Sequence, residues 1–300
     1  MDSVVKLKPC VKSYIWGGKF FQKFGKSDLD IVSELWEVSV RGESSSVIAS
    51  GPLKGKRLDE VLTKADLGPN VEKFDRFPFL IKLIDANDNL SVQVHPSDEY
   101  ALKYENSYGK TEMWHILSAE KGAGIYVGFK KDYSREEIEE KLKSCDILSC
   151  LNFFEAKPGE TYMITAGTIH AIGAGVRLYE MQQNSDLTYR LYDYLRKDKD
   201  GNYRELHIDK ALKVIDYKKY VPSTSSDSLL AKNKYFIVNK YEFDGELEIS
   251  ANEGSFVSFT FVSGKGQVDD ISYQEYDSFF LPFGKTCKIK GKGKVIVSRV

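Results

Sequence analysis

Residues 79–96 read FLIKLIDANDNLSVQVHP, and this stretch gives the first evidence on the fold class. Its first six residues are almost all large and apolar, which is typical of a buried strand. The polar segment 85–89 indicates a turn, and residues 90–95 are predicted to form a second strand. Pro96 should end that strand, because proline cannot donate a hydrogen bond to a neighbouring strand. The stretch therefore predicts two consecutive short strands.

The same pattern continues on both sides of this stretch. Further strands are predicted at 35–40, 112–117, 124–129, 162–164, 169–172 and 176–183. Helices are few, and they are predicted at 58–67, 134–145 and 205–216. Short strands at regular spacing, separated by glycine and proline turns, favour an antiparallel barrel or sandwich.

The chain divides into three parts by composition. Residues 222–228 read PSTSSDS, and we expect a linker at 222–234 on that basis. Residues 1–221 are expected to form the first and larger domain, with helical insertions. Residues 235–300 are strand-rich and punctuated by glycine, which predicts a smaller second β domain. None of the four histidines lies beyond residue 207, so the second domain should hold no imidazole metal site.

Composition narrows the functional class. The chain has 300 residues, 42% hydrophobic content and a net charge of -1, which gives no basic field for nucleic acid. No apolar run approaches the ~20 residues that span a membrane. Residues 1–7 lack the apolar core of a signal peptide. None of the four cysteines sits in a CxxC pair. We therefore expect a cytoplasmic protein with reduced thiols and a small-molecule partner.

Two histidines and a carboxylate fall on separate predicted strands. Gln93 and His95 point to the same face of one strand, because side chains two residues apart share a face. Glu112 begins the next clear strand of the barrel, and His170 lies on a third. Imidazole and carboxylate groups suit zinc. From spacing alone, the alternative remains that these histidines are buried residues with ordinary hydrogen bonds.

Two cationic residues accompany this set. Arg190 lies in a segment rich in aromatic and amide groups, where its guanidinium could stabilise an anion or a developing oxyanion. The alternative is a structural arginine paired with Asp186 or Asp193. Lys110 lies two residues before Glu112, so it should sit beside the metal site if both share a strand face. The alternative is a surface lysine.

Five motifs together resemble the type I mannose-6-phosphate isomerases, and more narrowly their short bacterial form. In chain order they are YIWGG at 14–18, LSVQVHP at 90–96, GKTEMW at 109–114, AGTIHA at 166–171 and QQNSDLTYR at 182–190. The similarity runs through most of residues 5–215. The C-terminal part resembles the family only in length and β character.

The resemblance implies a cupin-type β-barrel (jelly roll), a second smaller cupin-like domain and one zinc ion per chain. His95, Glu112 and His170 would then be zinc ligands, and Gln93 is expected to be a fourth. Arg190 matches the active-site arginine of the family, and Lys110 matches a lysine that contacts substrate or handles a proton. His115 departs from the family, where we expect an aromatic residue such as tyrosine; by alternation it faces away from Glu112.

The implied activity is the interconversion of mannose 6-phosphate and fructose 6-phosphate through a cis-enediol. The base is left open between Lys110, a zinc-bound water and an unassigned carboxylate. Two other functions are compatible with a cupin barrel, because fold does not fix function. One is an iron-dependent oxygenase, since two histidines and a carboxylate also bind iron. The other is a sugar-binding protein without catalysis.

Overall fold

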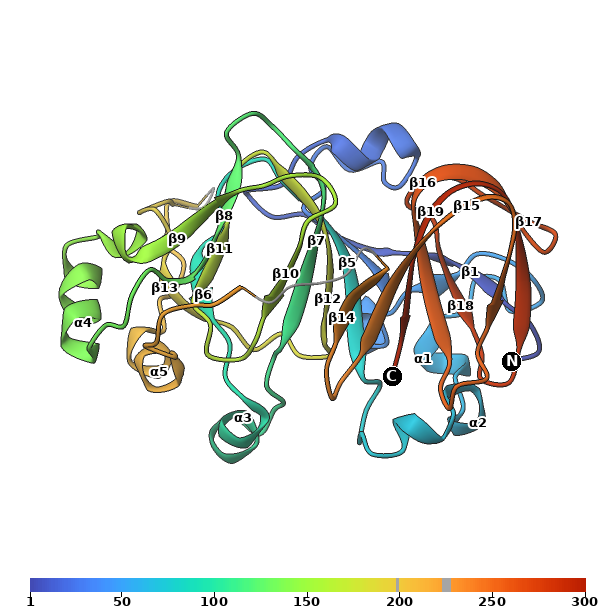
Figure 1. The fold of residues 1–300 in the computed structure, drawn as a ribbon, viewed down its shortest axis with the longest axis horizontal. Helices are drawn as coiled ribbons and strands as arrows, with labels where there is room; N and C mark the ends of the chain where they lie inside the picture. Colours follow the sequence, from blue (N-terminus) through green and yellow to red (C-terminus); the bar gives the residue numbers. More distant parts are fainter. Residues whose placement is uncertain (198–199, 223–227) are drawn as a thin grey trace.

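The residues that the structure describes form three antiparallel β-sheets, two of which make up one barrel. The computed structural model describes residues 1–197, 200–222 and 228–300. Figure 1 shows the barrel on the left and a second β body, coloured orange to red, on the right. The predicted fold class, a mainly β cupin-type barrel with few helices and a second β body, is confirmed.

The barrel consists of a six-stranded and a five-stranded sheet. The first has the order β10 (Thr161–Ile164), β7 (Glu112–Ala119), β12 (Val176–Gln183), β5 (Phe79–Ala86), β3 (Glu34–Val38) and β2 (Cys10–Lys12). The second has the order β13 (Tyr189–Tyr192), β6 (Val92–Val94), β11 (His170–Ile172), β8 (Gly124–Phe129) and β9 (Leu151–Glu155). Buried side chains from both sheets, among them Ile84, Trp114, Val127 and Leu178, form the core between them.

The apolar run at 79–84 is explained by the position of β5. This strand lies between β12 and β3, and all eight of its residues are buried. Ile84 faces the barrel interior, while Ile81 and Leu83 belong to a second core shared with the other β body. A strand that is covered on both faces needs apolar side chains on both faces, which removes the usual alternation.

The second β body is an eight-stranded sheet whose long strands bend around a core of their own. Its order is β14 (Leu229–Lys232), β15 (Ile237–Ser250), β19 (Thr286–Arg299), β16 (Val257–Val268), β18 (Ser278–Leu281), β1 (Val5–Lys8) and β4 (Val47–Ile48), and β17 (Ile271–Tyr273) pairs with β16. One face packs on the barrel, and the other encloses a cluster that includes Phe259, Phe279 and Ile289.

The chain termini share this second body, which bears on the predicted division of the chain. The predicted domain at 235–300 does not form its sheet alone, because β1 and β4 pair beside β18. Strand β14 lies inside the stretch predicted as a linker, 222–234. Residues 223–227 of that linker lie outside the described residues. The division into a catalytic and a second domain stays a prediction.

Helices are short and lie at the periphery. They are α1 (Leu58–Val61), α2 (Lys64–Leu67), α3 (Asp98–Tyr104), α4 (Arg135–Lys143) and α5 (Ile208–Val214), with 3-10 turns η1 (Phe20–Phe24), η2 (Gly42–Ser44), η3 (Pro69–Val71) and η4 (Ile147–Cys150). The predicted helix 58–67 is wrong in one respect: it is two single turns, because Thr63 caps the start of α2 and breaks the run. Helices α4 and α5 contribute to the core on the outer face of the five-stranded sheet.

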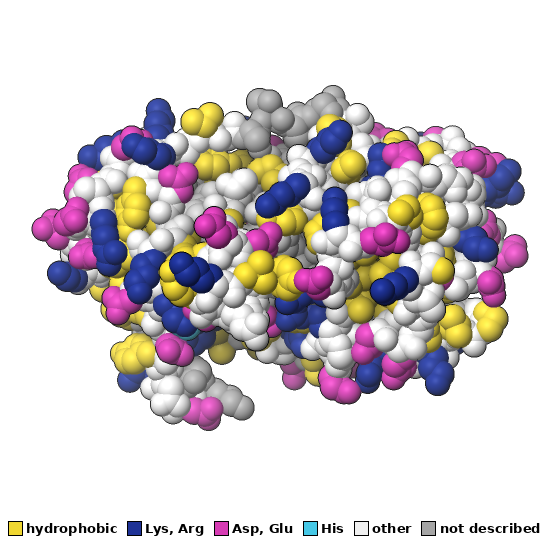
Figure 2. Space-filling model, turned by 90° about the horizontal axis from the view of Figure 1, so that it is seen from below, with side chains coloured by type: hydrophobic (Ala, Val, Ile, Leu, Met, Phe, Trp, Pro, Cys, Tyr) yellow, Lys and Arg dark blue, Asp and Glu magenta, His cyan; other side chains and the backbone are white. Residues whose placement is uncertain are grey.

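The surface carries charges of both signs. Figure 2 shows acidic and basic side chains interspersed over one face of the molecule, in keeping with the net charge of -1. Among the described residues, no helix combines the length and apolar character that crossing a membrane would require.

One carboxyl group is fully buried between the barrel and the second body. Glu37 lies on β3, which contacts β1 and β18 of the eight-stranded sheet, and it is 0% exposed. Burial raises the pKa of Glu37 to about 7, although the positive charge of Lys26 opposes the shift. The folded protein therefore holds this proton more tightly than the unfolded chain does.

We predict that Glu37→Gln removes a pH-dependent loss of stability. Because the pKa is raised in the folded state, the wild type should lose about 2 to 3 kcal/mol relative to the variant as the pH rises from 5 to 8. The free energy of unfolding from urea titrations at both pH values measures this difference. Glu43→Gln, at an exposed residue, is the control. Its free energy of unfolding should change between the two pH values by the same amount as that of the wild type. Parallel pH dependence of the wild type and Glu37→Gln would contradict the prediction.

Candidate metal centre and active-site cavity

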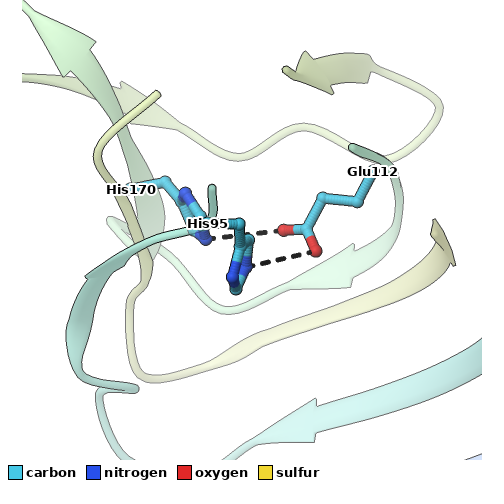
Figure 3. A group of neighbouring side chains, drawn as sticks. All are labelled: His95, Glu112 and His170. Carbon is cyan, nitrogen blue, oxygen red and sulfur yellow. Dashed lines mark ion pairs between the residues drawn. The ribbon is translucent and has the colours of Figure 1, made fainter. Parts of the chain in front are cut away.

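Three buried side chains from three strands meet inside the barrel. His95 directly follows β6, Glu112 begins β7, and His170 begins β11. Their potential ligand atoms all lie within 4.8 Å of one another. The Nε2 atom of His95 is 3.6 Å from Oε2 of Glu112, and Nε2 of His170 is 3.5 Å from Oε1. Figure 3 shows both imidazoles pointing at the carboxylate.

Backbone carbonyl groups hold both imidazoles in the orientation that a metal ligand needs. Nδ1 of His95 is 2.9 Å from the Leu187 oxygen, and Nδ1 of His170 is 2.8 Å from the Thr168 oxygen. A carbonyl can only accept, so each Nδ1 carries the proton and each Nε2 keeps its lone pair. Burial lowers the pKa of His95 well below its usual value and that of His170 to about 4. Both rings are therefore neutral near pH 7.

The donor set fits a zinc ion. Among the described residues, Nε2 of His95 and Nε2 of His170 are buried without a hydrogen-bond partner. Two ligand atoms on tetrahedral zinc lie roughly 3.3 to 3.4 Å apart, because each zinc–ligand bond is about 2.0 to 2.1 Å. The observed separations of 3.5 and 3.6 Å between nitrogen and carboxylate oxygen are close to this value.

Gln93 lies beside these residues in a row across the five-stranded sheet. On β6 it is directly opposite His170 of β11 and opposite Arg190 of β13. Directly opposed residues of antiparallel strands point to the same face. Gln93, His170 and Arg190 therefore share one face of the sheet. The role of Gln93 as a fourth ligand stays a prediction.

This face borders a cavity of about 320 Å³. Gln93, Lys110 and Arg190 line it together, and Trp16 forms part of its wall. The basic residues that line the cavity are Lys82, Lys110, Arg190 and Arg204, and the acidic residues are Glu34, Glu180 and Asp186. A pocket with four cations is suited to an anionic ligand.

Lys110 is a buried residue and not a surface lysine. Its side chain is 6% exposed, and its Nζ lies 2.7 Å from Oε2 of Glu112. The same Nζ is 3.9 Å from Oε1 of Glu180. Lys110 therefore partly balances the charge of the predicted metal-ligand carboxylate.

Arg190 makes its contacts with neutral oxygen atoms. Its Nε donates to Oγ of Ser91 at 3.3 Å, and its NH1 donates to the Glu205 carbonyl at 2.8 Å. The alternative partners considered from the sequence bind other arginines: Asp186 pairs with Arg41, and Asp193 pairs with Arg196 and Arg204. Within the described ranges, Arg190 has no carboxylate partner.

The sequence did not predict a second cluster of charged side chains, which lies on the six-stranded sheet. Lys82 Nζ lies 3.1 Å from Oε1 of Glu180 and 3.5 Å from Oε2 of Glu34. The indole nitrogens of Trp114 and Trp36 donate to Glu180 and Glu34 at 3.0 and 2.6 Å. One signal was present: Lys82 interrupts the apolar run 79–84, where an unpaired charge would be costly.

The pKa values of two buried carboxyl groups, those of Glu112 and Glu180, are shifted in opposite directions. Burial raises the pKa of Glu112 to about 7, and the neighbouring charge of Glu180 adds to the shift. Burial would also raise the pKa of Glu180, but the charge of Lys82 and that of Lys110 lower it to about 2. Glu180 is therefore the more firmly ionised of the two in the protein alone, and Glu112 is the one that gains most from another cation.

Comparisons with known proteins point to one family. A family model described as phosphomannose isomerase type I, catalytic domain, matches residues 4–122. The mannose-6-phosphate isomerase ManA of Bacillus subtilis is 35% identical, over 98% of this chain and 98% of that protein. The crystal structure of the mannose 6-phosphate isomerase from Bacillus subtilis covers 100% of both chains with a TM-score of 0.90 at 34% identity. A zinc-bound mannose 6-phosphate isomerase, 17% identical over 99% of both chains, has a TM-score of 0.79, which shows a shared fold.

We predict that His170→Ala lowers zinc affinity by at least about 100-fold. Losing even an outer-shell partner of a metal ligand typically costs 10- to 100-fold, and His170 is predicted to bind the ion directly. His115→Ala is the matched control, because His115 is also buried but contacts Thr161 on the other face of β7. Titration of zinc against a competing chelator measures both. Equal affinities for the two variants would remove His170 from the ligand set.

Proposed function

Because the chain belongs to the type I phosphomannose isomerase family, we propose that it interconverts mannose 6-phosphate and fructose 6-phosphate with one zinc ion per chain. The observation that carries this proposal is the buried His95, Glu112 and His170 cluster beside a cavity lined by cations. Two histidines and a carboxylate could also hold iron. The relatives named as mannose-6-phosphate isomerases favour the isomerase over an iron oxygenase or a sugar-binding protein.

The reaction moves a proton between neighbouring carbon atoms. The aldose ring opens first, a base removes the proton from C2, and the resulting cis-enediol takes a proton back at C1. The energetic difficulty is the negative charge that develops on the oxygen atoms at C1 and C2. When bound, zinc supplies Lewis acidity that lowers the cost of this charge.

The chain itself supplies a cation for the same charge. Arg190 shares a sheet face with Gln93 and His170, so its guanidinium can face the carbon atoms that react. Its contacts with Ser91 and the Glu205 carbonyl orient the guanidinium before substrate binds. A donor that is already oriented stabilises developing charge without a reorganisation cost. We assign Arg190 the role of stabilising the oxygen atoms at C1 and C2.

We assign Lys110 the role of carrying a proton between the substrate oxygen atoms at C1 and C2. Its Nζ lines the cavity and lies between Glu112 and Glu180. An ammonium group there can give a proton to the oxygen at C1 and take one back from the oxygen at C2. The proton from carbon needs a different acceptor, because an ammonium group has no free lone pair. Two buried acidic side chains that line the cavity, Glu34 and Glu180, can take it.

The cytoplasm is the proposed location. The cysteine residues Cys10, Cys145, Cys150 and Cys287 are free thiols, and Cys145 is exposed. Free thiols persist in a reducing compartment. The proposed partner is a small sugar phosphate, and the mixture of positive and negative side chains in the cavity can bind both its phosphate and its hydroxyl groups.

We predict that the purified protein forms fructose 6-phosphate from mannose 6-phosphate in a zinc-dependent manner. A coupled assay should show turnover that a strong chelator abolishes and that added zinc restores. Oxygen uptake measured after loading the protein with iron tests the oxygenase alternative. Absence of turnover from zinc-loaded protein would overturn the proposed function.

We further predict that Arg190→Ala lowers kcat by about 100- to 1,000-fold, the usual cost of losing one oriented donor to an oxyanion. Zinc content should not change, because Arg190 lies one strand beyond Gln93. Arg190→Lys should restore only part of the rate, since a lysine keeps the charge but not the planar fork. Near wild-type turnover in Arg190→Ala would show that the assigned role is wrong.

A further inference from the structure

The residue that carries the proposed proton lies outside regular structure. Lys110 belongs to the segment 105–111, which joins α3 to β7, and β7 begins only at Glu112. A lysine side chain on a connecting segment is free to move unless the segment is fixed. Misplacing a reacting group by about 1 Å can cost 100-fold in rate. The contacts that hold this segment are therefore relevant to catalysis.

Each of the three amide groups around Lys110 has its own acceptor. The Gly109 amide donates to Oδ1 of Asp98 at 3.0 Å, and the Lys110 amide donates to the Pro96 carbonyl at 3.0 Å. The Thr111 amide donates to Oε1 of Gln183 at 2.8 Å. The acceptors come from the segment after His95 and from the end of β12, which are separate parts of the barrel wall.

Gly109 brings the lysine segment into direct contact with the backbone that follows His95. A Cβ atom at residue 109 would lie 2.4 Å from the Asp98 nitrogen and 2.7 Å from the Pro96 oxygen. Both distances are too short for a side chain, so only glycine allows this approach. The segment that carries Lys110 and the one that carries His95 are thus packed backbone to backbone.

Asp98 connects these contacts with the C-terminal part of the chain. Its Oδ1 also accepts from Nε2 of Gln183 at 3.0 Å, and its Oδ2 accepts from the Tyr235 hydroxyl at 2.5 Å. Tyr235 is 9% exposed and lies between β14 and β15 of the second β body. One carboxylate therefore joins the lysine segment, the end of β12 and the second body.

We propose that Asp98 and Tyr235 are positioning residues that fix Lys110 against Glu112, so that the second β body takes part in building the active site. This inference rests on the proposed function of Lys110 as the proton carrier. The structural part, namely that Tyr235 restrains segment 109–111 through Asp98, is independent of what the enzyme acts on.

The substitution that tests the proposal is Tyr235→Phe, which removes one hydroxyl group and little volume. Tyr179→Phe is the matched control, because the Tyr179 hydroxyl also joins the barrel to the second body, through Ser298 at 2.9 Å, but does not contact the lysine segment. We expect Tyr235→Phe to lower kcat about 3- to 10-fold with KM changed less than twofold. Asp98→Ala should lower kcat about 10- to 100-fold. Tyr179→Phe should leave kcat unchanged.

A second measurement does not depend on activity. Hydrogen exchange followed by mass spectrometry should show faster exchange of the amides at 109–111 in Asp98→Ala and Tyr235→Phe, and wild-type exchange there in Tyr179→Phe. Zinc content should equal that of the wild type in all three variants. If exchange responds but the wild type lacks isomerase activity, the proposed function fails and the positioning stands. Unchanged exchange at 109–111 in both Asp98→Ala and Tyr235→Phe would overturn the inference.

Discussion

The site depends on compensating one buried carboxylate. Glu112 is 0% exposed, and moving a carboxylate out of water is costly unless opposite charge replaces the lost hydration. Lys110 lies 2.7 Å away, yet the pKa of Glu112 is still raised to about 7, so one ammonium group does not suffice. Two neutral imidazoles present lone pairs to the same point. A divalent cation at that point would offset the charge of the carboxylate and bind the lone pairs of both imidazoles. The three ligands meet there only because the ends of β6, β7 and β11 lie close together.

On the six-stranded sheet, the buried carboxylates Glu34 and Glu180 are compensated by protein groups alone, without a metal. Lys82 lies between Glu34 and Glu180, and both tryptophan indoles donate to these carboxylates. The register explains how: Trp36, Lys82, Glu180 and Trp114 are directly opposite one another on β3, β5, β12 and β7. Residues in such a row share a face, so a single layer of the sheet brings cation, carboxylates and donors together. Glu180 is then held ionised beside Glu112.

The sequence predicted the strands of the barrel better than the partners of its charged side chains. Alternation, proline and glycine locate strands because their effects are local, and three separate strands could be expected to carry His95, Glu112 and His170. Pairing between distant strands follows no local rule, so the contact of Lys82 with Glu180 and the addition of β1 and β4 to the C-terminal sheet were not predicted. Lys110 was ambiguous for the same reason: burial depends on the segment folding back on Pro96 and Asp98.

The distribution of ion pairs explains why Arg190, of the four cavity cations, suits the developing charge of the reaction. Lys82 and Lys110 lie against Glu180 and Glu112, and Arg204 pairs with Asp193. Each of these charges is largely offset within the protein. Arg190 instead donates to a serine hydroxyl and a carbonyl, which orient the guanidinium but do not neutralise it. An oriented cation whose charge is not offset gives the strongest attraction to an enediolate, because no existing ion pair has to be broken first.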